Sequence, residues 1–159
     1  MEYQIDYVEA DIDDVLGFVP YMREADVREV QGLGHTPEYA VVSSFQKSDK
    51  VWVVLLNYVP AGLLGIGTVS ILGCQGCPWF LGGKILDTWQ GKRALLRESP
   101  EKLKEFISDY DMLVNYVDAD YKAAIRWLKW LGFTVSDKPK PNYLTGNQYY
   151  EVKMVAKDV

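Results

Sequence analysis

The chain has 159 residues, of which 48% are hydrophobic and 25% are charged, and this is enough to build one domain with a buried core. Such a composition excludes a disordered chain, and the longest apolar stretch, residues 51–72, is interrupted by Asn57, Pro60 and glycines, which excludes a membrane span. The 22 acidic and 17 basic residues give a net charge of −5, which argues against a nucleic-acid partner. We expect a single domain over residues 1–159.

The first third of the chain is expected to form one strand and three helical segments. Apolar and polar residues alternate over residues 3–8, as in a half-buried strand. Asp11 is placed to cap a helix that Pro20 ends, and Thr36 with the proline after it is placed to begin another. Between these two lies a short helix over residues 23–31, closed by glycines.

The middle of the chain is expected to form three antiparallel strands. Residues 51–59 are rich in β-branched and aromatic side chains, and residues 60–62 (Pro-Ala-Gly) are typical of a turn. A second strand follows to Leu72, then a turn over residues 73–76, and then a third strand towards Leu86.

The last third is expected to alternate helices and strands. Ser99 and Pro100 are typical of a helix start, with residues 92–97 as a further extension backwards. A buried strand over residues 112–119 precedes a helix over residues 120–131, and the chain closes with two strands. The predicted order is β, helices, βββ, α, β, α, ββ, which is an α+β fold with a central mixed sheet. The buried face of the last helix is expected to carry Ala124, Leu128 and Leu131.

Few residues have the spacing of a known catalytic or metal site. Cys74 and Cys77 form a CxxC pair, but zinc would need two more soft ligands, and a redox pair would need a helix N-terminus rather than a turn. We therefore expect no metal.

The remaining candidates are interpreted as structural residues. His35 is interpreted as a capping or surface residue, because the sequence has no nucleophile motif that would use it. Residues 65–67 (Gly-Ile-Gly) lie within a strand and predict a bulge or a close backbone contact. Trp127 and Trp130 are read as core or interface residues.

Residues 118–135, DADYKAAIRWLKWLGFTV, resemble the C-terminal motif of the GNAT (Gcn5-related N-acetyltransferase) superfamily, and the order of elements agrees with it. The resemblance implies a GNAT-like central mixed, mainly antiparallel sheet flanked by helices. Residues 77–133, with WFLGG, QGKR, LVNYV and AAIRWLKWLGF, are also similar to the small GNAT-like internal virion proteins of short-tailed bacteriophages.

The GNAT resemblance implies a binding site for the pyrophosphate of acetyl-CoA, formed by a Q/RxxGxG/A loop before a helix. The matching stretch offers Gln90, Gly91, Lys92 and Arg93, but it lacks the second and third small residues. In the last helix, the usual Asn is replaced by Tyr121, and the Tyr that commonly protonates the departing thiolate is replaced by Leu128, which cannot donate a proton.

Because these family residues are missing, the sequence leaves open whether the protein is an enzyme, and three functions are considered. The first is a catalytically degenerate virion or assembly component with protein partners such as other virion proteins and no cofactor. It would lie in the host cytoplasm or in the virion. The alternative is an acetyl-CoA-dependent N-acetyltransferase that uses Lys92 and Arg93 for phosphate and a Glu or Asp as base. A third reading is a binding module such as a host-factor inhibitor, which an acidic surface would suit.

Overall fold

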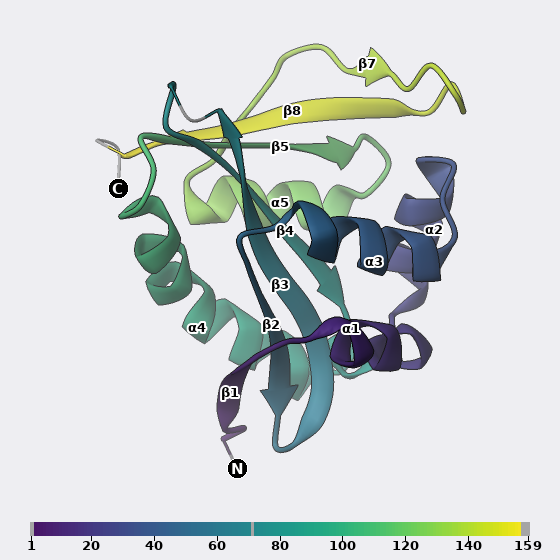
Figure 1. Cartoon of the computed structure of the whole chain (residues 1–159), viewed down its shortest axis with the longest axis vertical. Helices are drawn as coiled ribbons and strands as arrows, with labels where there is room; N and C mark the ends of the chain where they lie inside the picture. Colours follow the sequence, from purple (N-terminus) through teal and green to yellow (C-terminus); the bar gives the residue numbers. More distant parts are fainter. Residues whose placement is uncertain (1, 71, 157–159) are drawn as a thin grey trace.

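A mixed sheet runs through the computed structural model, which describes residues 2–70 and 72–156 (Figure 1). Within these residues the sheet has eight strands in the order β1-β2-β3-β4-β5-β8-β6, and β7 pairs with the outer part of β8. All neighbouring pairs are antiparallel except β4 and β5, which are parallel. The predicted α+β class and its mainly antiparallel sheet are therefore confirmed.

The N-terminal segments follow the sequence pattern closely. Asp11 caps α1 through a reciprocal pair of bonds with Asp14, and the Thr36 hydroxyl accepts a bond from the Tyr39 N–H at the start of α3. Pro20 lies in a short 3-10 helix directly after α1. The elements are β1 (Ile5–Glu9), α1 (Ile12–Phe18), the 3-10 helix Val19–Tyr21, α2 (Glu24–Gly32) and α3 (Pro37–Lys47).

The three middle strands are present, but the first turn is not where the sequence predicted it. β2 (Lys50–Leu56) and β3 (Val59–Ser70) are joined at Asn57 and Tyr58, which both have positive φ, as a two-residue hairpin turn requires. Pro60 instead lies within β3, beside an irregularity in the register with β2 that accommodates its missing N–H. β4 (Gln75–Gly82) follows, and Ile71, expected in the preceding strand, lies outside the described residues.

The helix start expected at Ser99 is wrong, whereas the backward extension over residues 92–97 is confirmed, because the helix begins at Trp89. α4 (Trp89–Ile107) is continuous, is capped by Thr88 and contains Pro100 in its interior. The Ser99 hydroxyl donates to the Leu95 carbonyl instead of capping a helix start. Proline leaves the carbonyl of Leu96 without its helical partner, and that residue is exposed, so water can reach the carbonyl.

The last third matches the predicted order of elements, except that the described residues close with three strands rather than two, because β7 forms where a loop was expected. The elements are β5 (Met112–Asp118), α5 (Lys122–Leu131), β6 (Thr134–Val135), β7 (Lys140–Pro141) and β8 (Gln148–Val155). In α5 it is Ile125 that is buried, whereas Ala124, Leu128 and Leu131 are half-buried. All three pack against the core on this side of the sheet, so the predicted face is confirmed, but they are not fully buried because they also line a pocket.

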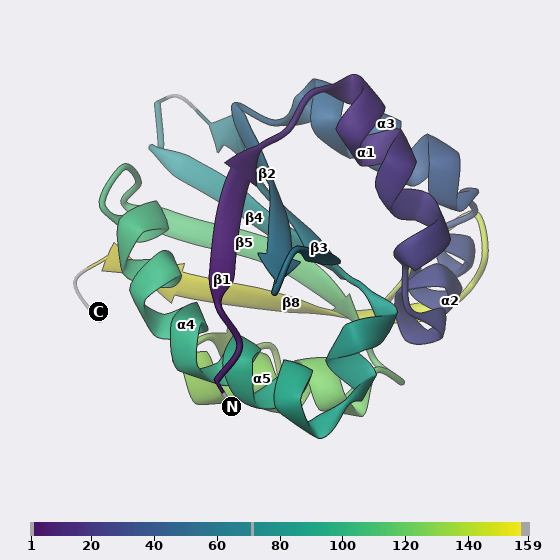
Figure 2. The same cartoon turned by 90° about the horizontal axis from the view of Figure 1, so that it is seen from below.

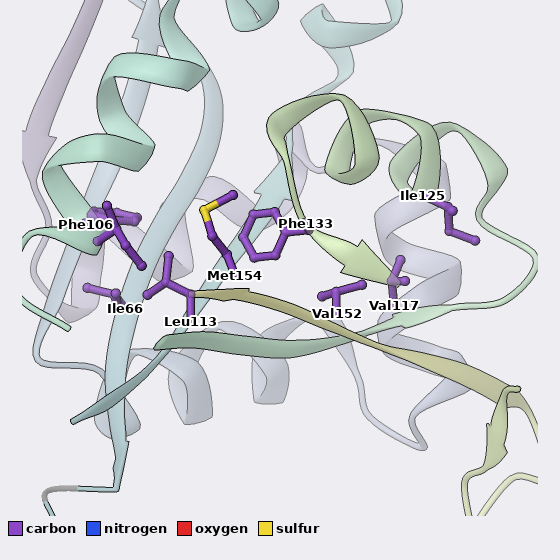
Figure 3. Packing of buried hydrophobic residues seen from close by; sticks show 9 residues of the cluster. Ile66, Phe106, Leu113, Val117, Ile125, Phe133, Val152 and Met154 are labelled. Atoms are coloured by element: carbon purple, nitrogen blue, oxygen red, sulfur yellow. The ribbon is translucent and has the colours of Figure 1, made fainter. Parts of the chain in front are cut away.

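The sheet separates two groups of helices, each with its own core. Figure 2 shows α1, α2 and α3 on one side and α4 and α5 on the other. The core on the α1–α3 side includes Phe18, Val41 and Leu63. The core on the α4–α5 side joins both helices to β5 and β8 through the residues drawn in Figure 3, among them Phe106 and Leu113. No helix within residues 2–70 and 72–156 is both long and apolar enough to cross a bilayer.

Candidate functional site: a gap in the sheet with a pocket on each side

The parallel strands β4 and β5 pair only where they begin. Gln75 is paired with Met112 and Gly76 with Leu113, and beyond these residues the strands part (Figure 1). The sheet therefore contains a gap, called here the β4–β5 gap, bordered by β4 from Cys77 onward and by β5 from Val114 onward.

The edge of β4 that faces the gap has backbone groups that the backbone of β5 does not pair with. Pro78 carbonyl accepts a bond of 2.6 Å from the Asn115 amide, and Gly82 carbonyl accepts one of 2.8 Å from the Arg23 N–H. Because backbone groups of alternate strand residues point the same way, the N–H and C=O of Phe80 face the gap as well. An extended ligand in the gap could bond to them as a neighbouring strand would.

On the α4–α5 side, the gap opens into an apolar pocket of about 150 Å³. The rings of Phe80 and Trp127 lie side by side in its lining, tilted by 59° to each other with centroids 5.8 Å apart. Lys102 lies at its wall, with its ammonium group over the rings of Tyr7 and Trp52 at 4.5 and 4.2 Å. The aliphatic and aromatic lining includes Phe80, Leu95, Leu103, Trp127, Leu128 and Leu131.

On the α2–α3 side, the gap opens into a larger pocket of about 630 Å³, called here the polar pocket. Hydroxyl groups of α3 and β3 and charged side chains line it together with apolar residues such as Leu33 and Leu81, so it is more polar than the first pocket and suits a molecule with both polar and apolar parts. The polar lining includes Glu29, His35, Ser43, Ser44, Lys47 and Thr68.

Four residues line both pockets and therefore lie where they meet: Glu29, Trp79, Asn115 and Tyr116. The Trp79 indole is held by a 2.8 Å bond to the Ser48 hydroxyl, and it packs so closely on Gly65 that a Cβ there would lie 2.4 Å from the ring. The close backbone contact predicted for residues 65–67 is thus confirmed.

Glu29 is the carboxyl group at this junction. Burial, followed by the charges of Asp26 and Asp118, raises its pKa to about 8, and the guanidinium of Arg23 offsets only part of this rise. Asp26 is buried, forms an ion pair with Arg23 and accepts a 3.4 Å bond from the Tyr121 hydroxyl. Glu29 can therefore take up or release a proton near neutral pH, as a general base must.

The residues predicted to hold a cofactor lie together at the start of α4. Gln90, Lys92 and Arg93 are exposed, and they belong to the helix rather than to a loop. Gly91 is buried, and a Cβ there would lie 2.2 Å from the Ile85 carbonyl oxygen, so this glycine is required for packing. Its N–H is already bonded to the Thr88 hydroxyl at 3.1 Å, so it is not free for a phosphate.

The other sequence candidates do not form a catalytic group. Cys74 lies in a turn with positive φ, whereas Cys77 lies on β4 rather than in the predicted turn, and burial raises the pKa of the Cys77 thiol. His35 is half-buried, lines the polar pocket and stacks on Tyr39 with centroids 4.8 Å apart. Among the described residues, no group of three or more metal-binding side chains is found.

Comparisons with known proteins agree on the fold. No family model matches the sequence, and no curated protein is significantly similar to it. A presumed acetyltransferase of known structure has a TM-score of 0.74 at 11% identity, covering 99% of this chain and 91% of that chain. The chain has the GNAT acetyltransferase fold. A GNAT-family acetyltransferase from Streptococcus pneumoniae gives a TM-score of 0.63 at 16% identity, covering 96% of this chain and 99% of that chain.

A third structure is RimL, the ribosomal L7/L12 α-N-protein acetyltransferase in complex with coenzyme A. It has a TM-score of 0.66 at 13% identity and covers 96% of this chain and 94% of that chain. At these identities the likeness shows the GNAT fold alone. The resemblance to phage internal virion proteins gains no support from these comparisons.

Sequence reasoning did not single out Glu29, Asn115 or Trp79. Glu29 is one of many acids on an amphipathic helix, and Asn115 interrupts a short apolar strand. A polar residue within an otherwise apolar run of a predicted strand is the one signal that could have marked the gap.

Proposed function

We propose that the protein is a coenzyme A-dependent N-acyltransferase whose donor thioester lies in the β4–β5 gap. The observation that carries this proposal is the meeting of two unlike pockets at Glu29, Trp79, Asn115 and Tyr116. A donor on the apolar side and an amine on the polar side can reach each other there without crossing a closed sheet.

The residues on the donor side fit coenzyme A in two places. The N–H and C=O of Phe80 face the gap and suit the amide groups of an extended arm. Lys92 and Arg93 are exposed in the first turn of α4, where the helix dipole also favours phosphate. When bound, the thioester would supply the acyl group and a thiolate leaving group.

Glu29 is proposed as the base on the acceptor side. In its ionised form Glu29 can accept the proton that the amine nitrogen loses when its bond to the acyl carbon forms. It can return this proton to the thiolate that is released when the carbon–sulfur bond breaks, so no net proton is consumed. Because the pKa of Glu29 is about 8, the rate should rise with pH up to about that value.

One observation favours the non-catalytic reading, in which the protein is a virion or assembly component. The start of α4 has a single glycine, and that glycine is occupied in packing against Ile85. A GNAT fold that has lost its cofactor would leave the gap as a structural remnant, and binding experiments separate the two readings.

Calorimetric titration with coenzyme A and acetyl-CoA is the first test. We expect micromolar dissociation constants, weakened by Lys92→Ala and Arg93→Ala, with a larger effect of both variants at low salt. Lys104→Ala, an exposed lysine near the other end of α4, serves as the matched control and should leave affinity unchanged. The absence of binding at millimolar ligand would refute the acyltransferase and favour the non-catalytic reading.

The second test measures thiol release from acetyl-CoA with spermidine and with a peptide that has a free α-amino group. If either amine is accepted, the rate should rise towards pH 8, and Glu29→Gln should reduce it by about 10²-fold or more. An unchanged pH profile in Glu29→Gln would show that another group acts as the base.

A further inference from the structure

The indole N–H of Trp127 is a buried hydrogen-bond donor that has no acceptor within residues 2–70 and 72–156. Buried donors in folded proteins almost always have a partner, because leaving one unpaired is costly. Trp127 lines the apolar pocket, and its Nε1 atom is covered by neighbouring side chains, so a ligand in that pocket could provide the missing acceptor once those side chains move aside.

The rest of the pocket wall is suited to a hydrocarbon group. Leu95, Leu103, Leu128 and Leu131 form much of the lining, and the volume is about 150 Å³. An engineered apolar cavity of about 150 Å³ in another protein admits benzene, so a pocket of this size holds about six carbon atoms.

The position of Trp127 connects this pocket to the gap. Its ring contacts that of Phe80, with centroids 5.8 Å apart, and Phe80 is one of the β4 residues whose backbone faces the gap. A ligand whose apolar chain enters the pocket from the gap would keep its polar end near β4. Trp127 would then lie beside that polar end.

We infer that the apolar pocket binds the acyl chain of the donor, an unbranched chain of about four to six carbons, with its carbonyl oxygen accepting a bond from the Trp127 indole. The inference rests on the proposed function and makes it more specific. The preferred donor is then a short- or medium-chain acyl thioester rather than acetyl-CoA.

The pocket can be tested without coenzyme A. In ¹⁵N-labelled protein, titration with hexanamide should shift the indole signal of Trp127, which is identified by its loss in Trp127→Phe. Acetamide has the same carbonyl but no chain, and it should leave the signal in place. Trp130→Phe is the matched control, because Trp130 is on the same helix, is 57% exposed and is not part of the pocket wall.

The donor preference is tested by calorimetry with coenzyme A, acetyl-CoA, butyryl-CoA and hexanoyl-CoA. Hexanoyl-CoA should bind roughly 10- to 100-fold more tightly than acetyl-CoA, since each buried methylene adds to affinity. Trp127→Phe should weaken hexanoyl-CoA binding about fivefold, whereas Trp130→Phe should not change it. Leu128→Phe, which fills the pocket, should remove the advantage of the longer chain.

The outcomes distinguish the two proposals. Equal affinities across the acyl series, or a Trp127 signal that hexanamide does not move, would overturn the acyl-chain inference while leaving coenzyme A binding intact. Failure of both coenzyme A and acetyl-CoA to bind would overturn the proposed function, and with it the thioester donor.

Discussion

The two pockets beside the β4–β5 gap are built in different ways. The apolar pocket is bordered by α4 and α5, whose apolar side chains recur at helical spacing and can be recognised in the sequence. The polar pocket combines side chains from the consecutive helices α2 and α3 with side chains from β3, β4 and β5, which come later in the chain. A hydrophobic pattern therefore identifies the helices that line the apolar pocket. The polar side chains of the other pocket are brought together only by tertiary structure.

The largest expected effect is a difference in unfolding free energy between a substitution in the closed core and one beside the open pocket. Leu113 is fully buried among the α4–α5 core residues, so Leu113→Ala should cost about 2 to 5 kcal/mol of unfolding free energy. Leu128 already borders open space, so Leu128→Ala should cost less, about 1 to 2 kcal/mol. Denaturant unfolding measures both, and equal costs would mean that Leu128 lies in a closed core and that the pocket is filled.

The second prediction tests what the glycine at the start of α4 is for. Gly→Ala inside a helix normally stabilises it by about 0.5 to 1 kcal/mol, but a Cβ at Gly91 would clash with the Ile85 carbonyl. We expect Gly91→Ala to destabilise the protein by about 1 to 3 kcal/mol.

Gly17 in α1 provides the matched control, because a Cβ there would meet nothing within 4 Å. Gly17→Ala should stabilise the protein by about 0.5 to 1 kcal/mol in the same unfolding assay. If Gly91→Ala were as stable as Gly17→Ala, the glycine would be free of packing, and a role in approaching a phosphate would again be open.

Much of the fold could be predicted from local signals. The caps at Asp11 and Thr36 and the order of strands and helices are encoded by residues close in sequence. The errors lie where tertiary structure overrides a local preference. Pro100 resembles a helix start, yet the helical turns before it pack on the sheet. The helix therefore continues past Pro100 without a break. Pro60 resembles a turn, but the hairpin closes at Asn57 and Tyr58.

The candidate site was predicted only in part. Gln90, Lys92 and Arg93 do share one helical turn, as their adjacency implies. Glu29 was not predicted, because its raised pKa arises first from burial in the folded protein and then from the charges of Asp26 and of Asp118, which is 89 positions away. Long-range electrostatics of this kind leave no periodic trace in a single sequence.

The last prediction concerns the polar side of the gap and the pH dependence of stability. The pKa of Glu29 is raised from 4.5 to about 8 in the folded protein. Between these values the folded protein binds a proton that the unfolded chain has released, so the free energy of unfolding should fall as pH rises. The contribution is about 1 kcal/mol per pH unit within this window and levels off above about pH 8.

Glu29→Gln should remove this contribution, because the amide stays neutral at every pH. Unfolding free energies measured at pH 5.5, 6.5 and 7.5 should therefore fall less steeply in the variant than in the parent. Glu38→Gln, at an exposed glutamate in the first turn of α3, should keep the slope of the parent. Parallel curves for the parent and Glu29→Gln would mean that Glu29 ionises as an ordinary surface carboxyl. The junction of the two pockets would then be open to water, and the acyl transfer proposed there would lack its base.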